Sequence, residues 1–320
     1  MFKSPLIHAC VVLTAAGIIS ARADLAQGLV AYWDFEKGAA NVAPSGGVAY
    51  DGKMLGAAKL SSAAKVGTHA LKLDGNSAYV HVAGPVDATK PWTLSAWFQP
   101  EAAPGPDTRR MIYESTGNFS ISFGLRASKT PGAINTQVSS STTGTKYLPA
   151  NHDVPADTFI GKWHHVVEVY TPALPTQKGK IVVYLDGQQT HSVAVAAGDS
   201  LLAVDGLNLG TYREANGRWF EGRIDEVAFW NRALEASEAK KLMTLGENNQ
   251  PIFAPGVVAS DAASGAVSDG TEAESAPTSG SNLPLIIGGA VVVLALAGVG
   301  GFFLLRKKET AADLPPPPGH

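Results

Sequence analysis

The clearest hydrophobic pattern in the chain lies between Arg218 and Leu234, in the sequence RWFEGRIDEVAFWNRAL. Apolar and polar residues alternate through its middle, which predicts a β-strand with two distinct faces. One predicted face carries Ile224, Glu226, Ala228 and Trp230. The other carries Asp225, Val227 and Phe229. Because neither face is wholly polar, the pattern predicts a central strand that is covered on both sides, as in a two-sheet sandwich.

Shorter runs of the same kind recur upstream and are separated by residues that favour turns. They cover 28–36, 69–73, 78–82, 92–98, 111–113, 119–125, 134–138, 163–170, 180–185 and 207–209. A single helix is predicted over 235–245, ending near Gly246. Short strands at this spacing predict an all-β fold, a two-sheet antiparallel jelly-roll sandwich.

Two stretches inside this region do not have the pattern of a strand. Glu101–Arg110 and Ser139–Thr158 are polar and rich in Pro, Gly, Ser and Thr. We predict that both are loops, and long loops on a rigid β scaffold commonly carry binding sites.

The first 23 residues have the layout of a secretory signal peptide. Lys3 precedes an apolar run, and Ala21-Arg22-Ala23 provides a cleavage site with small residues. The alternative, a retained membrane anchor, fits less well because the run is shorter than the roughly 20 residues that span a bilayer.

The C-terminal part of the chain predicts a membrane tether. Residues 283–305 are uncharged and strongly apolar, and Arg306-Lys307-Lys308 follows them directly. This predicts one C-terminal transmembrane helix with residues 306–320 in the cytoplasm. Residues 251–282 contain no lysine or arginine and predict a disordered stalk. The predicted jelly-roll domain, 24–250, then lies outside the cell membrane, in the periplasm or at the cell surface.

Composition narrows the possible partners. The chain has 25 basic and 28 acidic residues, a net charge of −3, and no long basic run. Nucleic acid is therefore not an expected partner. The one cysteine, Cys10, lies in the predicted signal peptide, so the mature chain is expected to lack disulfides, which favours a bacterial source.

Six segments in a fixed order carry a resemblance to a known family. They are GLVAYWDFEKG from Gly28, HALKLDGNSAYVHV from His69, WTLSAWFQP from Trp92, GKWHHVVEVY from Gly161, KIVVYLDGQ from Lys180 and FEGRIDEVAFWNRAL from Phe220. Together they resemble the bacterial laminin-G-like jelly rolls of the concanavalin A-like lectin/glucanase superfamily. The resemblance implies two antiparallel sheets and recognition of a glycan or a protein, often without catalysis.

The resemblance also implies a candidate metal site. Some members hold a structural calcium ion, and the carboxylates carried over to this chain are Glu36 and Asp225. The loop before Asp51-Gly52 departs from the family pattern, since it reads Pro44-Ser45-Gly46-Gly47. Two interpretations stay open: calcium bound by these carboxylates, or hydrogen bonds from them to the backbone.

The sequence does not predict a catalytic residue. A glycoside hydrolase needs two carboxylates facing one bond, but Asp225 and Glu226 are adjacent and are expected on opposite faces of their strand. His164 and His165 are adjacent for the same reason and are not expected to bind one metal ion. One should pack in the core and the other should face a sheet surface.

Three aromatic residues are candidates for ligand binding: Trp97, which shares a predicted face with Thr93 and Ser95, and Tyr147 and Tyr212, which lie beside basic residues in predicted loops. The sequence thus predicts a membrane-anchored, non-catalytic module that recognises a glycan or a protein. The alternatives are a divergent glycan hydrolase and a passive or self-associating envelope protein.

Overall fold

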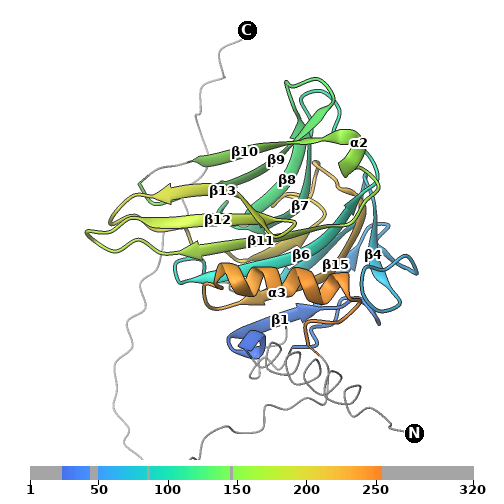
Figure 1. Cartoon of the computed structure of the whole chain (residues 1–320), viewed down its shortest axis with the longest axis horizontal. Coiled ribbons are helices and arrows are strands. Elements are labelled where there is room, and N and C mark those ends of the chain that lie inside the picture. The colour runs from blue at the N-terminus through green and yellow to red at the C-terminus, as the bar shows by residue number, and fades with distance from the viewer. Residues whose placement is uncertain (1–23, 44–49, 85–86, 145–146, 254–320) are drawn as a thin grey trace, which may run out of the picture. The chain divides into compact units, whose positions relative to one another are not determined.

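A computed structural model of the chain describes residues 24–43, 50–84, 87–144 and 147–253. These residues form two antiparallel β-sheets and few helices, which confirms the predicted all-β sandwich (Figure 1). They belong to the first of two compact units, Met1–Ala262. The predicted signal peptide, transmembrane helix and cytoplasmic tail lie outside the described residues, as does most of the predicted stalk. None of the described helices has the length and apolarity needed to cross a membrane.

The first sheet has eight strands in the order β13-β12-β11-β6-β15-β4-β3, and β1 also pairs with β15. Its strands are β1 (Leu29–Trp33), β3 (Lys59–Ser61), β4 (Ala70–Asp74), β6 (Trp92–Pro100), β11 (His164–Thr171), β12 (Gly179–Leu185), β13 (Gln188–Val195) and β15 (Glu221–Trp230).

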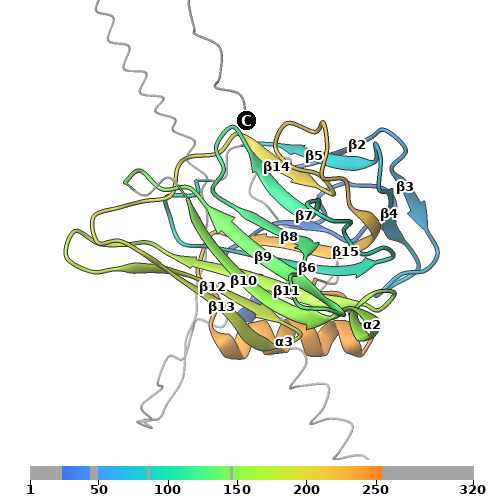
Figure 2. The ribbon, with the colours of Figure 1, turned by 90° about the horizontal axis from the view of Figure 1, so that it is seen from above.

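The second sheet has seven strands in the order β10-β9-β8-β7-β14-β5-β2 (Figure 2). They are β2 (Gly52–Leu55), β5 (Tyr79–Ala83), β7 (Arg109–Thr116), β8 (Ser122–Ala127), β9 (Ala133–Ser140), β10 (Leu148–Pro155) and β14 (Gly206–Leu209). The inner faces of the two sheets form one buried apolar core, in which Phe98 of β6 contacts Phe123 of β8 across the sandwich.

Strand β15 is central, as its pattern predicts, because it pairs with β6, β4 and β1. The predicted division of its faces is wrong beyond Asp225. The register with β6 shifts between Asp225 and Ala228, and Glu226 has a φ of 50°. This β-bulge reverses the alternation, so Ile224 faces the core together with Val227 and Phe229.

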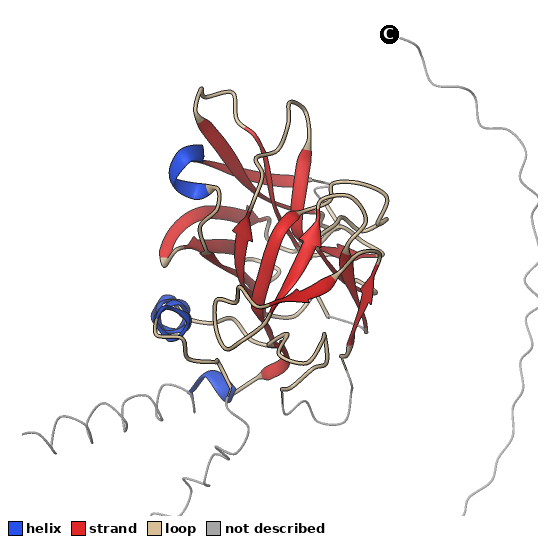
Figure 3. Ribbon diagram, turned by 90° about the vertical axis from the view of Figure 1, so that its right-hand side faces the viewer, coloured by secondary structure: helices blue, strands red, loops and turns tan. Residues whose placement is uncertain are grey.

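Helix α3 (Ala236–Glu247) covers the outer face of the eight-stranded sheet (Figures 1 and 3). Its buried residues, Ala239, Leu242, Leu245 and Gly246, lie on one side of the helix. They join a second apolar cluster, called here the α3-side cluster: Leu25, Leu29, Tyr32, Val167, Val169, Ala228, Trp230, Leu234, Ala239, Leu242, Leu245 and Ile252. Since Ile252 is buried, the ordered domain continues beyond the predicted boundary at residue 250.

Several edge elements differ from the predictions. Residues 148–155, predicted as part of a loop, form edge strand β10, followed by the short helix α2 (Ala156–Phe159). Strands β2, β3 and β13 were also not predicted. Strands β2, β3 and β10 bury at most one side chain each, so they lack the strong apolar alternation that identifies central strands. Strand β13 does alternate, but only from His191 onwards.

Candidate functional site

The two candidate calcium ligands lie on either side of one short loop. The Glu36 carboxylate accepts hydrogen bonds from the Thr68 and His69 amides, at 2.8 and 3.1 Å, and from the Thr68 hydroxyl. The fully buried Asp225 carboxylate accepts from the amides of Lys65 and Val66, at 2.8 and 3.1 Å. Both carboxylates therefore hold the 65–69 loop against the eight-stranded sheet.

These bonds match the second interpretation, in which the carboxylates bind the backbone. Calcium takes six to eight oxygen ligands, whereas N–H groups cannot coordinate it. Among residues 24–253, outside the undescribed gaps, no group of three or more His, Cys, Asp and Glu side chains is placed to hold a metal ion. The side chains in this arrangement do not fit calcium, and the calcium site stays a prediction from the resemblance.

The surroundings shift the pKa values of the two acids in opposite directions. Partial burial acts to raise the pKa of Glu36, but the hydrogen bonds from Thr68 and His69 outweigh it and lower this pKa. Burial raises the pKa of Asp225 to about 7, although its backbone hydrogen bonds act to lower it. Asp225 thus holds a proton more readily than an exposed carboxyl does.

Glu226, the residue after Asp225 in β15, is a third carboxylate in this region, and it is buried. It accepts a hydrogen bond from the Tyr32 hydroxyl at 2.6 Å and another from the Ile252 amide at 3.2 Å. Burial raises the pKa of Glu226 to about 8, and the neighbouring charge of Asp225 adds to this effect. Because of the bulge, both acids lie on the α3 side of the sheet, so the predicted opposite orientation is wrong.

The histidine pair has the predicted geometry. His164 stacks on Phe159, with ring centroids 3.7 Å apart, and its Nδ1 lies 2.7 Å from Asp186. His165 faces the other side of the sheet, where it contacts Trp97 at 4.8 Å. The two imidazoles therefore lie on opposite faces of β11 and do not converge on one ion.

Trp97 does not lie on an accessible surface. Its side chain is only 3% exposed, and Lys65 Nζ lies 4.1 Å from its ring centroid. Helix α3 crosses it at Gly246, where a Cβ atom would come within 2.3 Å of the indole nitrogen. Trp97 therefore packs beneath α3, out of reach of a ligand.

The outer face of the seven-stranded sheet carries polar residues, and no described helix covers it as α3 covers the other sheet. Directly opposed residues on neighbouring strands point to the same side of a sheet. They form a polar row across five strands: Lys53, His81, Asn208, Glu114 and Ser122. His81 and Asn208 are hydrogen-bonded at 2.9 Å, which fixes the middle of this row.

The loop between β14 and β15 folds over the polar row. Asn208 donates hydrogen bonds to the Tyr212 and Arg213 carbonyls, at 3.0 and 3.3 Å. The Arg213 guanidinium lies 2.9 Å from the fully buried Glu114 carboxylate, and Arg218 lies 4.0 Å from its other oxygen. Burial raises the pKa of Glu114, and its bonds with Arg213 oppose this rise. Glu114 thus sets the position of both arginines.

Around these arginines lies a group of aromatic rings. Tyr147 stacks on Phe119, with centroids 6.1 Å apart and planes inclined by 14°. The Arg213 guanidinium lies 5.4 Å from the Phe119 ring, and that of Arg218 lies 4.7 Å from Tyr212. We call these five residues the aromatic–arginine cluster. It joins two of the predicted residues, Tyr147 and Tyr212, although Tyr212 comes much later in the chain.

A polar groove of 240 Å³ lies further along the same sheet, at the ends of β8, β9 and β10. Arg126, Asn135, Asn151 and Asp153 are among the residues that line it. Asn135 donates to Asp153 at 2.9 Å, while its own side-chain oxygen is buried without a hydrogen-bond partner among the described residues. The groove therefore offers amide, carboxylate and guanidinium groups to a polar ligand.

The sequence did not identify Phe119, Arg213, Arg218 or Glu114 as parts of a site. Phe119 lies in the turn between β7 and β8, within a run that the pattern assigned to a strand. Arg213 was noted only as a neighbour of Tyr212. The one available signal was this pairing of an aromatic and a basic residue in a loop.

Comparison with known proteins agrees with the fold. A family model described as concanavalin A-like lectin/glucanases superfamily, laminin-G type, matches residues 74–240. A comparison with curated proteins finds no match. A binding domain of botulinum neurotoxin DC, solved in complex with SialylT, superposes with a TM-score of 0.53 at 11% identity, covering 69% of this chain and 52% of that one.

A second solved structure, the binding domain of paraclostridial mosquitocidal protein 1, gives a TM-score of 0.52 at 14% identity. The match covers 68% of this chain and 52% of that chain. This chain thus spans about half the length of both structures. At such identities the likeness establishes a shared fold.

Proposed function

The chain belongs to the concanavalin A-like lectin/glucanase superfamily, and from this membership we propose that it is a non-catalytic binding module for a glycan. The proposed site is the outer face of the seven-stranded sheet, centred on the aromatic–arginine cluster. Members of one fold family differ in function, so this proposal depends on the chemistry of the site and not on the fold alone.

The aromatic–arginine cluster is the observation that carries the proposal. A sugar ring has an apolar face of C–H groups and a rim of hydroxyls. The exposed ring of Tyr147 and the half-buried rings of Phe119 and Tyr212 offer apolar surface, while Arg213 and Arg218 offer N–H donors beside them. Glu114 holds Arg213 in place before any ligand arrives, which reduces the entropy lost on binding.

Two further features support a glycan. The polar groove at Arg126 and Asn135 supplies additional hydrogen-bonding groups on the same sheet face. Among proteins of the same fold, the matched neurotoxin domain is in complex with SialylT. An elongated ligand that stacks at the cluster and hydrogen-bonds in the groove would use both parts of this face.

The placement of the acids supports a binding role over hydrolysis. Asp225 and Glu226 are buried beneath α3 and the 65–69 loop, at 0% and 2% exposure, where a substrate does not reach them. Glu114 is fully buried and paired with Arg213. A glycoside hydrolase instead needs two carboxyl groups open to the cleft that holds the sugar.

The domain is further proposed to lie outside the cell membrane, tethered by residues 283–305. Leu25 and Ile252, near the two ends of the described chain, both pack in the α3-side cluster. The chain therefore enters and leaves the domain at the outer face of the eight-stranded sheet.

The test is a glycan array probed with the purified full-length protein in detergent, followed by titration of the strongest glycan. Tyr147→Ala should weaken its binding roughly three- to tenfold, the effect of losing one stacked ring. Leu174→Ala is the matched control. Leu174 is the other large apolar side chain that is strongly exposed among the described residues, at 55%, and it lies between β11 and β12 of the other sheet.

The possible results separate the candidate functions. A wild-type protein that binds no glycan but captures a defined protein would overturn the glycan proposal. Release of sugar products from the array ligands would favour a hydrolase. Equal losses in Tyr147→Ala and Leu174→Ala would mean that the cluster is not the site.

A further inference from the structure

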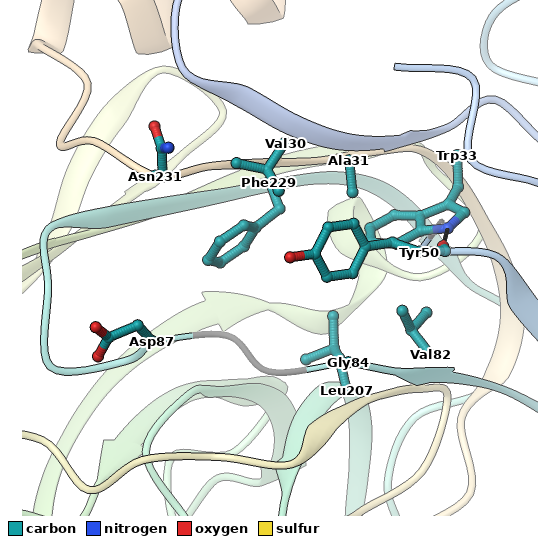
Figure 4. A pocket seen from close by; sticks show the side chains of 10 residues that line it. All are labelled: Val30, Ala31, Trp33, Tyr50, Val82, Gly84, Asp87, Leu207, Phe229 and Asn231. Carbon is teal, nitrogen blue, oxygen red and sulfur yellow. Dashed lines mark hydrogen bonds between the residues drawn. The ribbon is translucent and has the colours of Figure 1, made fainter. Parts of the chain in front are cut away.

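A cavity of 210 Å³ lies between the two sheets, away from the aromatic–arginine cluster (Figure 4). Strands β1 and β15 form one wall and strands β5 and β14 form the other. Its lining residues are Val30, Ala31, Trp33, Tyr50, Val82, Gly84, Asp87, Leu207, Phe229 and Asn231.

Most of this lining is apolar and rigidly held. Trp33, Val82, Leu207 and Phe229 are at most 7% exposed and belong to the main core. The Trp33 indole donates a hydrogen bond to the Tyr50 carbonyl at 2.8 Å, which ties Tyr50 to the wall. An apolar cavity of about 150 Å³ is large enough to take up benzene, so this larger one has room for a substituted ring.

Gly84 is required where Tyr50 crosses the cavity. A Cβ atom at this position would lie 3.0 Å from the Tyr50 ring, and its φ of 137° is unfavourable for residues with side chains. The ring therefore packs directly on the backbone, and its hydroxyl points along the cavity towards Phe229 (Figure 4).

Polar groups gather at one end of the cavity. Asp87 and Asn231, both exposed, lie at the end opposite Trp33 (Figure 4). One Asp87 oxygen accepts hydrogen bonds from the Thr89 amide and hydroxyl. Among the described residues, nothing hydrogen-bonds the other Asp87 oxygen, the Asn231 side chain or the Tyr50 hydroxyl. The cavity thus combines an apolar interior with a carboxylate and two neutral hydrogen-bonding groups that are free to bind a ligand.

We propose that this cavity binds a small molecule made of one aromatic ring, or an alkyl group of similar size, and an amino group. The ring would lie between Phe229, Trp33 and Leu207. The ammonium group would lie at the open end, where Asp87 supplies the opposite charge and Asn231 and Tyr50 accept hydrogen bonds. A glycan does not fit this interior, because its hydroxyls would lose water without gaining partners. The site therefore has a ligand class of its own.

The test uses three probes of nearly equal size but different charge: 2-phenylethylamine, 2-phenylethanol and phenylacetate. Their binding to the full-length protein in detergent is followed by ligand-observed NMR titration. We expect the amine to bind most tightly, the alcohol next and the acid least. Val30→Phe, at a half-buried position in the wall, should weaken all three by filling the cavity.

Asp87→Asn is the second variant, and it tests the charge. Because Asp87 is exposed, its loss should weaken the amine only about two- to fivefold and leave the alcohol unchanged. As a surface substitution, it stays informative even if Val30→Phe fails to fold. The proposal is overturned if no probe saturates, or if a folded Val30→Phe binds as the wild type does. It is also overturned if Asp87→Asn leaves the preference for the amine unaltered.

Discussion

The outer faces of the two sheets differ in what covers them. On the eight-stranded sheet, Trp97 lies beneath α3, and backbone amides of the protein itself bind the buried carboxylates of Asp225 and Glu226. On the seven-stranded sheet, Tyr147 is 43% exposed and Arg213 is a third exposed. Large aromatic residues thus occur on both faces in different surroundings.

This comparison separates stability from recognition. A tryptophan or a carboxylate on the covered face contributes to folding, because removing it leaves a cavity or an unpaired group. An exposed side chain on the open face, such as Tyr147, contributes little to folding and stays open to solvent. A residue type alone therefore does not indicate function in this fold. Whether the side chain is buried or exposed must also be known.

The largest expected effect is on the covered face. Trp230 is fully buried, and its indole donates a hydrogen bond to the Leu25 carbonyl at 2.7 Å. Trp230→Ala should lower the free energy of unfolding by about 3–5 kcal/mol, measured by urea denaturation. Tyr147→Ala, the matched change on the open face, should lower it by less than about 1 kcal/mol. Equal losses would show that the two faces do not differ in this way.

The next largest expected effect is on the pH dependence of the protein's stability. Burial raises the pKa of Glu226 to about 8 from its ordinary value of 4.5. Between these values the folded protein holds a proton that the unfolded chain releases, so stability should fall as pH rises through this range. Glu226→Gln should make this fall in stability with pH less steep. It should also lower the stability somewhat at every pH, because the amide nitrogen cannot accept the hydrogen bond from the Ile252 amide. Urea denaturation at a series of pH values measures both effects.

The control for this prediction is Glu247→Gln, at an exposed position near the end of α3. It should leave the pH dependence unaltered. If Glu226→Gln also leaves the slope unchanged, Glu226 is ionised in the folded protein, and the covered face tolerates a charge there.

The sequence predicted the central elements for a clear physical reason. β15 and α3 bury continuous apolar patterns, and such patterns appear directly in the order of residues. The bulge at Glu226 could not be predicted in this way, because a left-handed conformation at a glutamate is imposed by tertiary contacts and not by local preference. Once the bulge is missed, the predicted faces of every later residue in the strand are reversed.

The proposed site was predictable only in part. Tyr147 and Tyr212 were identified as loop aromatics, but their neighbours Phe119 and Arg213 were not, because sheet pairing brings these loops together. Trp97 lies on one face of β6 with Thr93 and Ser95, as predicted, but its side chain is buried and not accessible to a ligand. Nothing in the alternating pattern of β6 indicates that a helix more than a hundred residues later covers that face.

The smallest expected effect is that of calcium, and it sharpens the comparison most. Glu36 and Asp225 already accept hydrogen bonds from the 65–69 loop, so the covered face needs no ion to satisfy them. Thermal unfolding should give the same midpoint in calcium and in chelator. An ion bound only to the folded state would raise the midpoint as its concentration increases. If calcium raises it in the wild type and in Glu247→Gln but not in Asp225→Asn, the loop must turn oxygens towards these carboxylates, and the covered face would then be a metal site.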